Sequence, residues 1–209
     1  MQHHQEQKRY LTFNQHLQET FGEKVYKVTI DAGFTCPNRD GTRGAGGCIY
    51  CYGKRGTQNI VEPTAIKEQI RQGKAALQKK YKARKFLAYF QSYTNTYAPA
   101  NLLEKLYRAA LGEDDIVGVS IGTRPDCVEE DILDVIAALA QESYVWIEYG
   151  LQSIHAKTLQ LINRGHSLAE FLDAIVRTKR RQGIKICVHI ILGLPGESKE
   201  DMLETAQVL

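Results

Sequence analysis

The sequence predicts an α/β protein in which parallel strands alternate with helices, in the form of a partial (β/α) barrel. Strand and helix patterns alternate through five units between residues 24 and 209, which argues for parallel strands joined by right-handed crossovers. The polar, glycine-rich or cysteine-bearing stretches all follow a strand, which is where such barrels place their chemistry. A doubly wound open sheet is the alternative, but it would use only one or two of these loops.

Local patterns predict the individual elements. Five apolar segments that favour β structure are predicted as strands, at 24–31, 85–91, 116–121, 144–151 and 184–192. Helical spacing of apolar residues predicts helices at 11–22, 63–81, 99–112, 128–140, 156–161 and 167–181 and from 198 onward. Ser167 with Glu170 is a predicted capping box, and Asp126 with Glu129 is a second N-terminal capping signal. Residues 1–23 are predicted as a helical extension and 24–209 as the barrel.

The composition is that of an ordinary globular protein. The 209 residues are 43% hydrophobic and 24% charged, which is enough for one domain with a core. No apolar run approaches the length of a membrane span, so no membrane partner is expected. Five cysteines without a signal peptide indicate a reducing compartment, where thiolates serve metals and not disulfides. We therefore expect a cytoplasmic protein.

The net charge of +3 is unevenly distributed. Basic residues gather between Lys67 and Lys85, where Glu68 is the single acid, and again between Lys179 and Lys185. Such clusters are either solvated helix faces or the contact surface for a polyanionic partner. The sequence leaves both interpretations open.

Three cysteines in a glycine-rich loop are the strongest chemical signal. Cys36, Cys48 and Cys51 lie within sixteen residues of turn-prone sequence that can bring all three sulfurs to one centre. A structural zinc needs four protein ligands, and no histidine lies within a dozen residues of these cysteines. An iron–sulfur cluster held by only three cysteines would leave one iron open for a substrate or cofactor. Zinc or thiol chemistry is the alternative interpretation of a C-x-x-C pair.

The end of this loop, Cys48-Ile49-Tyr50-Cys51, resembles the cluster loop of the radical S-adenosylmethionine (SAM) enzymes. The eleven residues between Cys36 and Cys48 make a longer first gap than that superfamily usually has, and they resemble the YhcC/YtqA-like family. The stretches 90–99, 122–127, 148–153 and 189–197 resemble the same family in the same order. The last two also resemble the radical SAM domain of elongator-type tRNA-modifying enzymes. The resemblance implies a partial barrel of the radical SAM type.

The resemblance also implies two cofactors, a [4Fe–4S] cluster and SAM. The implied cluster ligands are Cys36, Cys48 and Cys51. Tyr50 would cover the cluster and present its backbone to the adenine of SAM. Gly193 and Gly196 would let the backbone approach the same adenine, although glycine and proline before a helix also form an ordinary turn.

Polar residues after the second and fourth strands are implied to bind the rest of SAM. Thr94 and Asn95 stand where the superfamily often carries Gly-Gly-Glu for the methionine amino group, and neutral oxygens bind an ammonium less strongly than a carboxylate does. Glu148, with Gln152 nearby, resembles the position that contacts the ribose or amino group. The alternative for Glu148 is an ion pair with Arg124 across the barrel mouth.

The remaining cysteines and histidines have simpler interpretations. Cys127 follows the third strand and is a candidate catalytic residue, because its S–H could give a hydrogen atom to a radical in the substrate cavity. Cys187 is expected to be a small buried apolar residue. His189 is expected to be a hydrogen-bonded core residue and His166 a surface residue.

The function that the resemblance implies is cleavage of SAM to a 5′-deoxyadenosyl radical for RNA modification, with the wobble uridine of tRNA as the target. The implied partners are tRNA and an electron donor such as flavodoxin or ferredoxin. Two alternatives stay open: a radical SAM enzyme acting on a small metabolite or protein, and a non-catalytic zinc or iron–sulfur binding module. Because the resembled family continues with a sixth strand and a carboxyl-terminal region, we expect a chain truncated before that strand.

Overall fold

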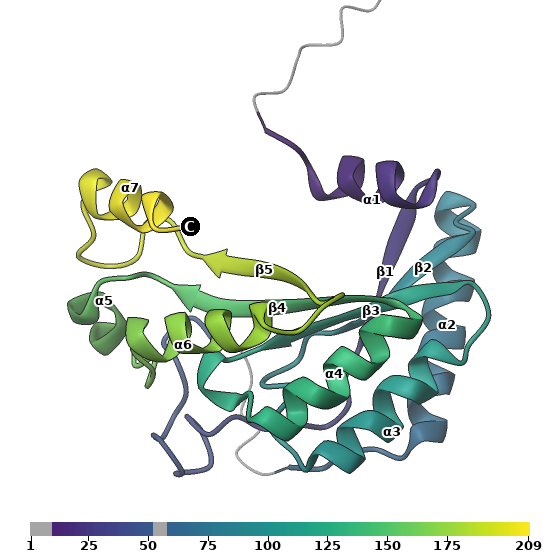
Figure 1. Ribbon diagram of the computed structural model, residues 1–209, viewed down its shortest axis with the longest axis horizontal. Coiled ribbons are helices and arrows are strands. Elements are labelled where there is room, and N and C mark those ends of the chain that lie inside the picture. Colours follow the sequence, from purple (N-terminus) through teal and green to yellow (C-terminus); the bar gives the residue numbers. More distant parts are fainter. Residues whose placement is uncertain (1–9, 52–57) are drawn as a thin grey trace, which may run out of the picture.

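The computed structural model describes residues 10–51 and 58–209, which form one twisted sheet with helices around it (Figure 1). The sheet has five parallel strands in the order β1-β2-β3-β4-β5. The strands are β1 (Val25–Ile30), β2 (Lys85–Phe90), β3 (Ile116–Thr123), β4 (Tyr144–Gln152) and β5 (Lys185–Ile190). The predicted α/β fold of five parallel strand–helix units is confirmed. In the described part of the chain, β1 and β5 are the two free edges of the sheet.

The helices cover the two faces of the sheet unequally. They are α1 (Phe13–Phe21), α2 (Pro63–Tyr81), α3 (Ala100–Leu111), α4 (Glu130–Glu142), α5 (Ala156–Leu161), α6 (Leu168–Lys179) and α7 (Lys199–Gln207), with a 3-10 turn η1 (Pro125–Cys127). Helices α2, α3, α4 and α6 lie along one face, and α1 lies on the other (Figure 1). Side chains of β2 alternate accordingly: Phe86, Ala88 and Phe90 join the main core, whereas Leu87 packs with Leu17 of α1. Among the described helices, none is long and apolar enough to cross a membrane.

Helix α1 covers one face of the sheet near the amino ends of the strands. Residues 1–9 of the predicted extension lie outside the described residues, and the rest of it forms this helix. Its side chains face an aromatic group on β4, with the Phe13 and Trp146 rings 4.9 Å apart and the Phe21 and Tyr144 rings 5.1 Å apart. Edge-to-face contacts of this kind add to the energy of apolar burial. We refer to this aromatic end, formed by α1, Tyr144 and Trp146, as the floor.

One of the two predicted caps forms. The Ser167 side chain accepts a hydrogen bond from the Glu170 amide, and the Glu170 carboxylate accepts one from the Ser167 amide, so this capping box is confirmed. The prediction for Asp126 is wrong, because α4 begins at Glu130 and its cap residue is Glu129, which makes no side-chain cap bond. The Asp126 carboxylate in η1 is bound instead by Arg124, the residue that precedes this turn.

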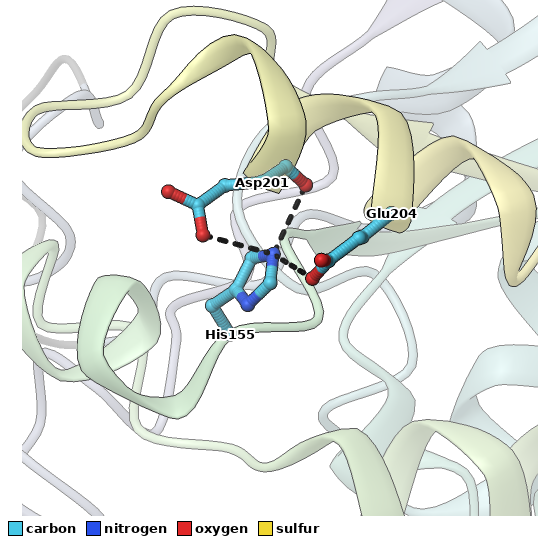
Figure 2. A group of neighbouring side chains, drawn as sticks. All are labelled: His155, Asp201 and Glu204. Carbon is cyan, nitrogen blue, oxygen red and sulfur yellow. Dashed lines mark hydrogen bonds and ion pairs between the residues drawn. The ribbon is translucent and has the colours of Figure 1, made fainter.

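Helix α7 docks on the start of α5 through a histidine (Figure 2). The His155 Nε2 lies 3.0 Å from the backbone oxygen of Asp201 and 3.7 Å from the carboxylates of both Asp201 and Glu204. The composition of this group is that of a metal site. However, Nε2 must donate its proton to the carbonyl of Asp201, which leaves that nitrogen no lone pair for a metal. Lys157 also binds Asp201 at 3.2 Å, so the group serves to attach α7.

Candidate cofactor and metal site

The three cysteines of the loop after β1 share one cavity at the carboxyl ends of the strands, which we call the mouth. Cys36 and Cys48 are buried and Cys51 is half-buried. The cavity has a volume of about 280 Å³. It is lined by residues at or beyond the ends of all five strands, among them Cys36, Cys48, Cys51, Thr94, Thr123, Gln152 and His189. The parallel topology therefore brings these loops together at one place.

A buried asparagine fixes the Cys48 side of the loop. Asn38 is 0% exposed, and its Nδ2 donates to the Cys48 Sγ at 3.6 Å and to the carbonyl of Asn163. The amide fits between two glycines. A Cβ at Gly44 would overlap the Asn38 Oδ1, and one at Gly165 would lie 3.0 Å from it. The space that the asparagine occupies therefore restricts Gly44, and Gly165 is restricted by this space together with its φ of 75°.

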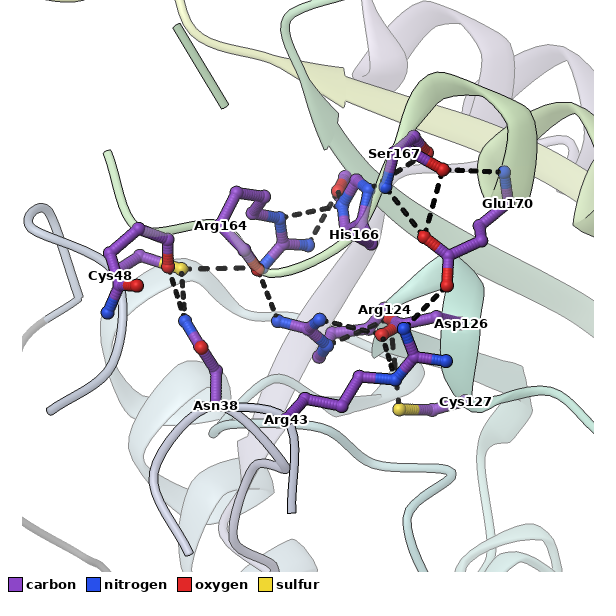
Figure 3. Close-up of polar contacts among 12 residues, drawn as sticks. Asn38, Arg43, Cys48, Arg124, Asp126, Cys127, Arg164, His166, Ser167 and Glu170 are labelled. Atoms are coloured by element: carbon purple, nitrogen blue, oxygen red, sulfur yellow. Dashed lines mark hydrogen bonds and ion pairs between the residues drawn. The ribbon is translucent and has the colours of Figure 1, made fainter. Parts of the chain in front are cut away.

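A second donor reaches the same sulfur from the turn after α5 (Figure 3). Arg164 Nη1 donates to the Cys48 Sγ at 3.6 Å, Nη2 to the Gly150 carbonyl at 2.6 Å, and Nε to the His166 Nε2 at 2.8 Å. The prediction that His166 is a surface residue is wrong, because it is buried against this guanidinium. Burial and the positive charge of Arg164 lower the pKa of His166 to about 4, so the imidazole accepts this bond as a neutral ring.

The turn that contains Arg164 also forms hydrogen bonds with the backbone of the cysteine loop. Asn163 adopts a left-handed conformation with φ of 53°, and its Nδ2 donates to the carbonyls of Ala45 at 3.1 Å and Gly47 at 2.8 Å. The Ile49 amide donates to the Ile162 carbonyl at 3.1 Å. From the sequence, this segment is only the connection between the helices predicted at 156–161 and 167–181. The signal that could have pointed to a site was an arginine and an asparagine in a turn at the carboxyl end of the barrel.

Ion pairs join this turn to η1 and α6. Arg124 binds Asp126 at 2.7 Å with both side chains almost fully buried, and its Nη1 donates to the carbonyl of Arg164 at 2.7 Å. Arg43 of the cysteine loop binds Asp126 at 3.2 Å and Glu170 at 2.5 Å. The alternative that Arg124 pairs with Glu148 is therefore wrong. Figure 3 shows these contacts as one network that runs from Cys48 to Glu170.

Glu148 is the centre of an ionic group inside the sheet. Its carboxylate binds Lys27 at 2.6 Å, Ser120 at 2.5 Å and His189 at 2.9 Å. Burial alone would raise the pKa of Glu148, but the hydrogen bonds from His189, Lys27 and Ser120 lower it to about 2. Hydrogen bonds with Cys187 and with Glu148 raise the pKa of His189 to about 9. The buried carboxylate of Glu148 is therefore paired with two basic side chains.

Comparison with known proteins identifies the family. A model of the radical SAM superfamily matches residues 38–209. The chain belongs to the radical SAM superfamily. YtqA of Bacillus subtilis is 43% identical over 97% of this chain and 63% of its own length. YhcC of Escherichia coli is 40% identical over 93% of this chain and 62% of its own length, so the chain spans less than two thirds of either relative. The predicted resemblance to YhcC/YtqA-like proteins is thereby confirmed.

Weaker similarities connect the chain to a tRNA-modifying synthase and to two solved structures. A tRNA-2-methylthio-N(6)-dimethylallyladenosine synthase of Desulforamulus reducens is 26% identical over 78% of this chain and 36% of its own length. Elp3 of Methanocaldococcus infernus superposes with a TM-score of 0.57 at 19% identity, covering 88% of this chain and 41% of that chain. Coproporphyrinogen III oxidase of Escherichia coli superposes with a TM-score of 0.55 at 14% identity, covering 88% and 40%. At these identities the two superpositions establish the fold alone.

Only some of the residues expected to bind SAM or substrate reach the cavity of the three cysteines. Tyr50, Thr94, Glu148 and Gln152 line this cavity. The residues that do not line it are Asn95, Gly193, Gly196 and Cys127. Asn95 is buried behind the wall, where its Nδ2 donates to the Gly122 carbonyl at 2.8 Å.

The two other cysteines differ from each other in burial. Cys127 lines a separate cavity of about 430 Å³, between the cysteine loop and η1. Burial, followed by the neighbouring Asp126, raises the pKa of its thiol to about 12. The expectation that Cys187 is buried is wrong, because it is partly exposed on edge strand β5, where it pairs in register with Glu148.

The cavity wall suits an anionic group bound by sulfur. Superfamily membership implies an iron–sulfur cluster and SAM in general. The Arg39 Nε is buried without a hydrogen-bond partner among the described residues. The guanidinium groups of Arg39, Arg124 and Arg164 line the same cavity as the three thiols. Cationic donors around soft sulfur ligands fit a cluster whose thiolates bring negative charge.

Proposed function

We propose that the protein is a radical SAM enzyme whose [4Fe–4S] cluster is held by Cys36, Cys48 and Cys51. The observation that carries this proposal is that three cysteines, and only these among the described ones, line the cavity at the mouth. Three thiolates leave one iron free for SAM. When bound, the two cofactors together supply a 5′-deoxyadenosyl radical.

The residues of this chain would position the cofactors and exclude water. Asn38 and Arg164 donate to the Cys48 sulfur, which orients that ligand and lowers the charge on it. Tyr50 lines the cavity beside the cysteines and would cover the cluster. Thr94 and Gln152 offer neutral oxygens and an amide to the methionine and ribose of SAM.

A zinc module is disfavoured by the arrangement of the thiols. A single zinc ion holds its sulfurs about 2.3 Å away, so they must lie close together. Among the described residues, the three cysteines do not form a group whose ligand atoms all lie within 4.8 Å of one another. A fourth thiolate from Cys127 is disfavoured as well, because Cys127 lines another cavity and burial raises the pKa of its thiol to about 12. Irons of a cluster are separate centres and allow a wider spacing.

RNA is the substrate class that we favour, with the tRNA wobble uridine as the proposed target. The similarity to a relative that is named as a tRNA-modifying synthase supports RNA. The basic clusters support it only in part. Arg71 is bound by Glu113 at 3.0 and 3.1 Å, and Lys79 and Lys80 lie in the last turn of α2, where they stabilise the helix dipole. Lys67, near the start of α2, remains the better candidate for a phosphate contact at the mouth.

The proposed function is tested by measuring 5′-deoxyadenosine formed from SAM by the reconstituted, reduced protein, with flavodoxin or ferredoxin as electron donor. We expect formation that is stimulated by tRNA and absent in Cys48→Ala. Lys67→Glu should weaken tRNA binding more than Lys79→Glu, and both affinities should fall with salt. Formation that tRNA does not stimulate would favour a small metabolite or protein substrate. No formation under any condition would contradict the enzyme itself.

A further inference from the structure

Tyr93, in the loop after β2, adopts a backbone conformation that is unfavourable for a large side chain. Its φ is 65°, and it is the only aromatic residue with a positive φ in the described part of the chain. The Thr94 amide donates to the Thr35 carbonyl of the loop after β1 at 3.2 Å. The Asn95 amide donates to the Gly122 carbonyl of β3 at the same distance. Strain of this kind persists only where surrounding contacts impose it, and it gathers at ligand sites.

The side chain of Tyr93 lies against an arginine of the cysteine loop. The guanidinium carbon of Arg39 is 5.6 Å from the centre of the Tyr93 ring, which is within the range of a cation–π contact. Arg39 is fixed in turn, because its Nη2 donates to the Cys51 carbonyl at 3.0 Å, and a Cβ at Gly47 would lie 2.7 Å from its Nε. Both side chains line the cavity of the three cysteines. The wall of the cofactor cavity therefore contains an aromatic ring and a guanidinium side by side.

Among the described residues, two other tyrosines line the same cavity, but each has another role. The Tyr89 ring lies 3.8 Å from the ammonium of Lys27, which binds Glu148. Tyr50 lies between two of the cysteines in the sequence and is assigned to the cluster in the proposed function. Tyr93 is thus the aromatic residue of this wall for which the proposed cofactors do not account.

The chemistry of the Arg39–Tyr93 pair is that of a binding surface for an unstacked nucleobase. Single-stranded segments of RNA are recognised by stacking their bases on aromatic rings and on arginine guanidinium planes. An enzyme that acts on a base takes that base out of its stack, and a ring of the protein then replaces the lost neighbours. A phosphate group would be bound by the guanidinium alone and would not need the ring.

We infer that Arg39 and Tyr93 form the surface on which the target base of the RNA stacks beside the cofactors, and that Tyr93 sets the position of this base. The inference rests on the proposed function, because it names the residues that hold an RNA substrate at the same cavity. The phosphate contact proposed for Lys67 is separate, since it binds the backbone of the RNA and not the base.

The test uses two RNA hairpins of the same anticodon stem-loop sequence, one with uracil at the wobble position and one abasic there. Fluorescence anisotropy gives their affinities for the reconstituted 209-residue chain, anaerobically, with SAM and without reductant. Tyr93→Leu removes the ring, and Tyr93→Phe keeps it on the same backbone. Tyr97→Leu is the matched control, because Tyr97 lies in the same loop but lines the other cavity, with Cys127. Iron content and the SAM-dependent electron paramagnetic resonance spectrum should equal those of the wild type in each variant.

We expect Tyr93→Leu to weaken binding of the uracil hairpin about tenfold, the size of one lost stack between a base and an aromatic ring, and to leave the affinity for the abasic hairpin unchanged. Tyr93→Phe and Tyr97→Leu should bind both hairpins as the wild type does.

The inference alone would be overturned by any of three results: equal affinities of the wild type for the two hairpins, an equal loss for both hairpins in Tyr93→Leu, or the same loss in Tyr97→Leu. Weaker SAM binding in Tyr93→Leu with unchanged RNA affinity would also overturn it, by assigning the ring to the cofactor. A wild type that cleaves SAM but binds neither hairpin would contradict the RNA substrate itself and the inference with it.

Discussion

The two ends of one sheet are buried in opposite ways. At the floor, α1 covers the interior with rings, and His16 binds the Tyr144 hydroxyl at 2.9 Å. At the mouth, Arg124 is buried, and the Arg39 Nε has no hydrogen-bond partner among the described residues, as is also true of the Trp146 Nε1 at the floor. An unpaired buried polar atom costs free energy unless a ligand or water satisfies it. The floor buries neutral rings, whereas the mouth gathers guanidinium groups around three thiols, so the mouth is the end suited to a charged group.

The largest expected difference between the two ends is in metal content. Cys36→Ala, Cys48→Ala and Cys51→Ala should each lose the iron of the reconstituted protein, because two thiolates cannot hold the cluster. Iron and sulfide analysis after anaerobic reconstitution measures this effect. Cys127→Ala and Cys187→Ala are the matched controls and should keep their iron. Full iron in a Cys48→Ala protein would show that another residue is the ligand.

Substitutions at the floor should lower stability and leave the iron content unchanged. Leu17 of α1 is 1% exposed and packs with Val25 and Leu87, so Leu17→Ala should lower the free energy of unfolding by about 2–4 kcal/mol. Its iron content should not change. Leu11, which is largely exposed, is the control, and Leu11→Ala should alter stability by less than about 0.5 kcal/mol. Denaturant unfolding of the iron-free chains gives these values, and an iron loss in Leu17→Ala would mean that the two ends are coupled.

A smaller effect is expected from filling the space around Asn38. Gly44→Ala places a methyl group on the Asn38 amide and should destabilise the chain by about 1–3 kcal/mol, as overpacking does. In an Asn38→Ala background the clash is removed, so the same substitution should cost much less. A double-mutant cycle from unfolding curves measures the coupling. Additive effects would mean that the glycine is not required by the asparagine.

The smallest expected effect is a pH dependence from the ionic group. Because the folded pKa of His189 is raised to about 9, its contribution to stability is present below pH 6.5 and is lost as the pH rises through 9. The opposite holds for Glu148, whose lowered pKa gives stability above pH 4.5 that is lost toward pH 2. The difference in unfolding free energy between the wild type and His189→Gln should therefore shrink between pH 6.5 and 9. A constant difference over that range would show that His189 is neutral in the folded protein.

The fold followed from the sequence because its signals are local. Apolar strands, helical spacing and the Ser167–Glu170 box each depend on residues a few positions apart, and the structure has them as predicted. The local rule failed at Asp126, where two arginines, one from the distant cysteine loop, bind the carboxylate more strongly than a helix end would. A capping signal in a site rich in arginine is therefore weak.

The candidate site could be predicted from the sequence only where its residues lie in one loop. Three cysteines within one loop predicted their shared cavity. The contact between Asn38 and Asn163 joins residues 125 positions apart, and no short motif predicts it. The group around Glu148 likewise joins side chains from four strands, β1, β3, β4 and β5. The sequence contained the residue types, but only the parallel pairing of β1 with β2 and β4 with β5 decides which of them meet.

The most direct test of the central claim is the electron paramagnetic resonance spectrum of the reduced, reconstituted cluster with and without saturating SAM. Three thiolates at the mouth leave one iron without a protein ligand, so SAM should bind that iron and change the spectrum. Cys127→Ala should show the same change, since that thiol lies in another cavity. A spectrum that SAM leaves unchanged would mean that a fourth protein ligand closes the cluster, and it would contradict the assignment of this cavity to SAM.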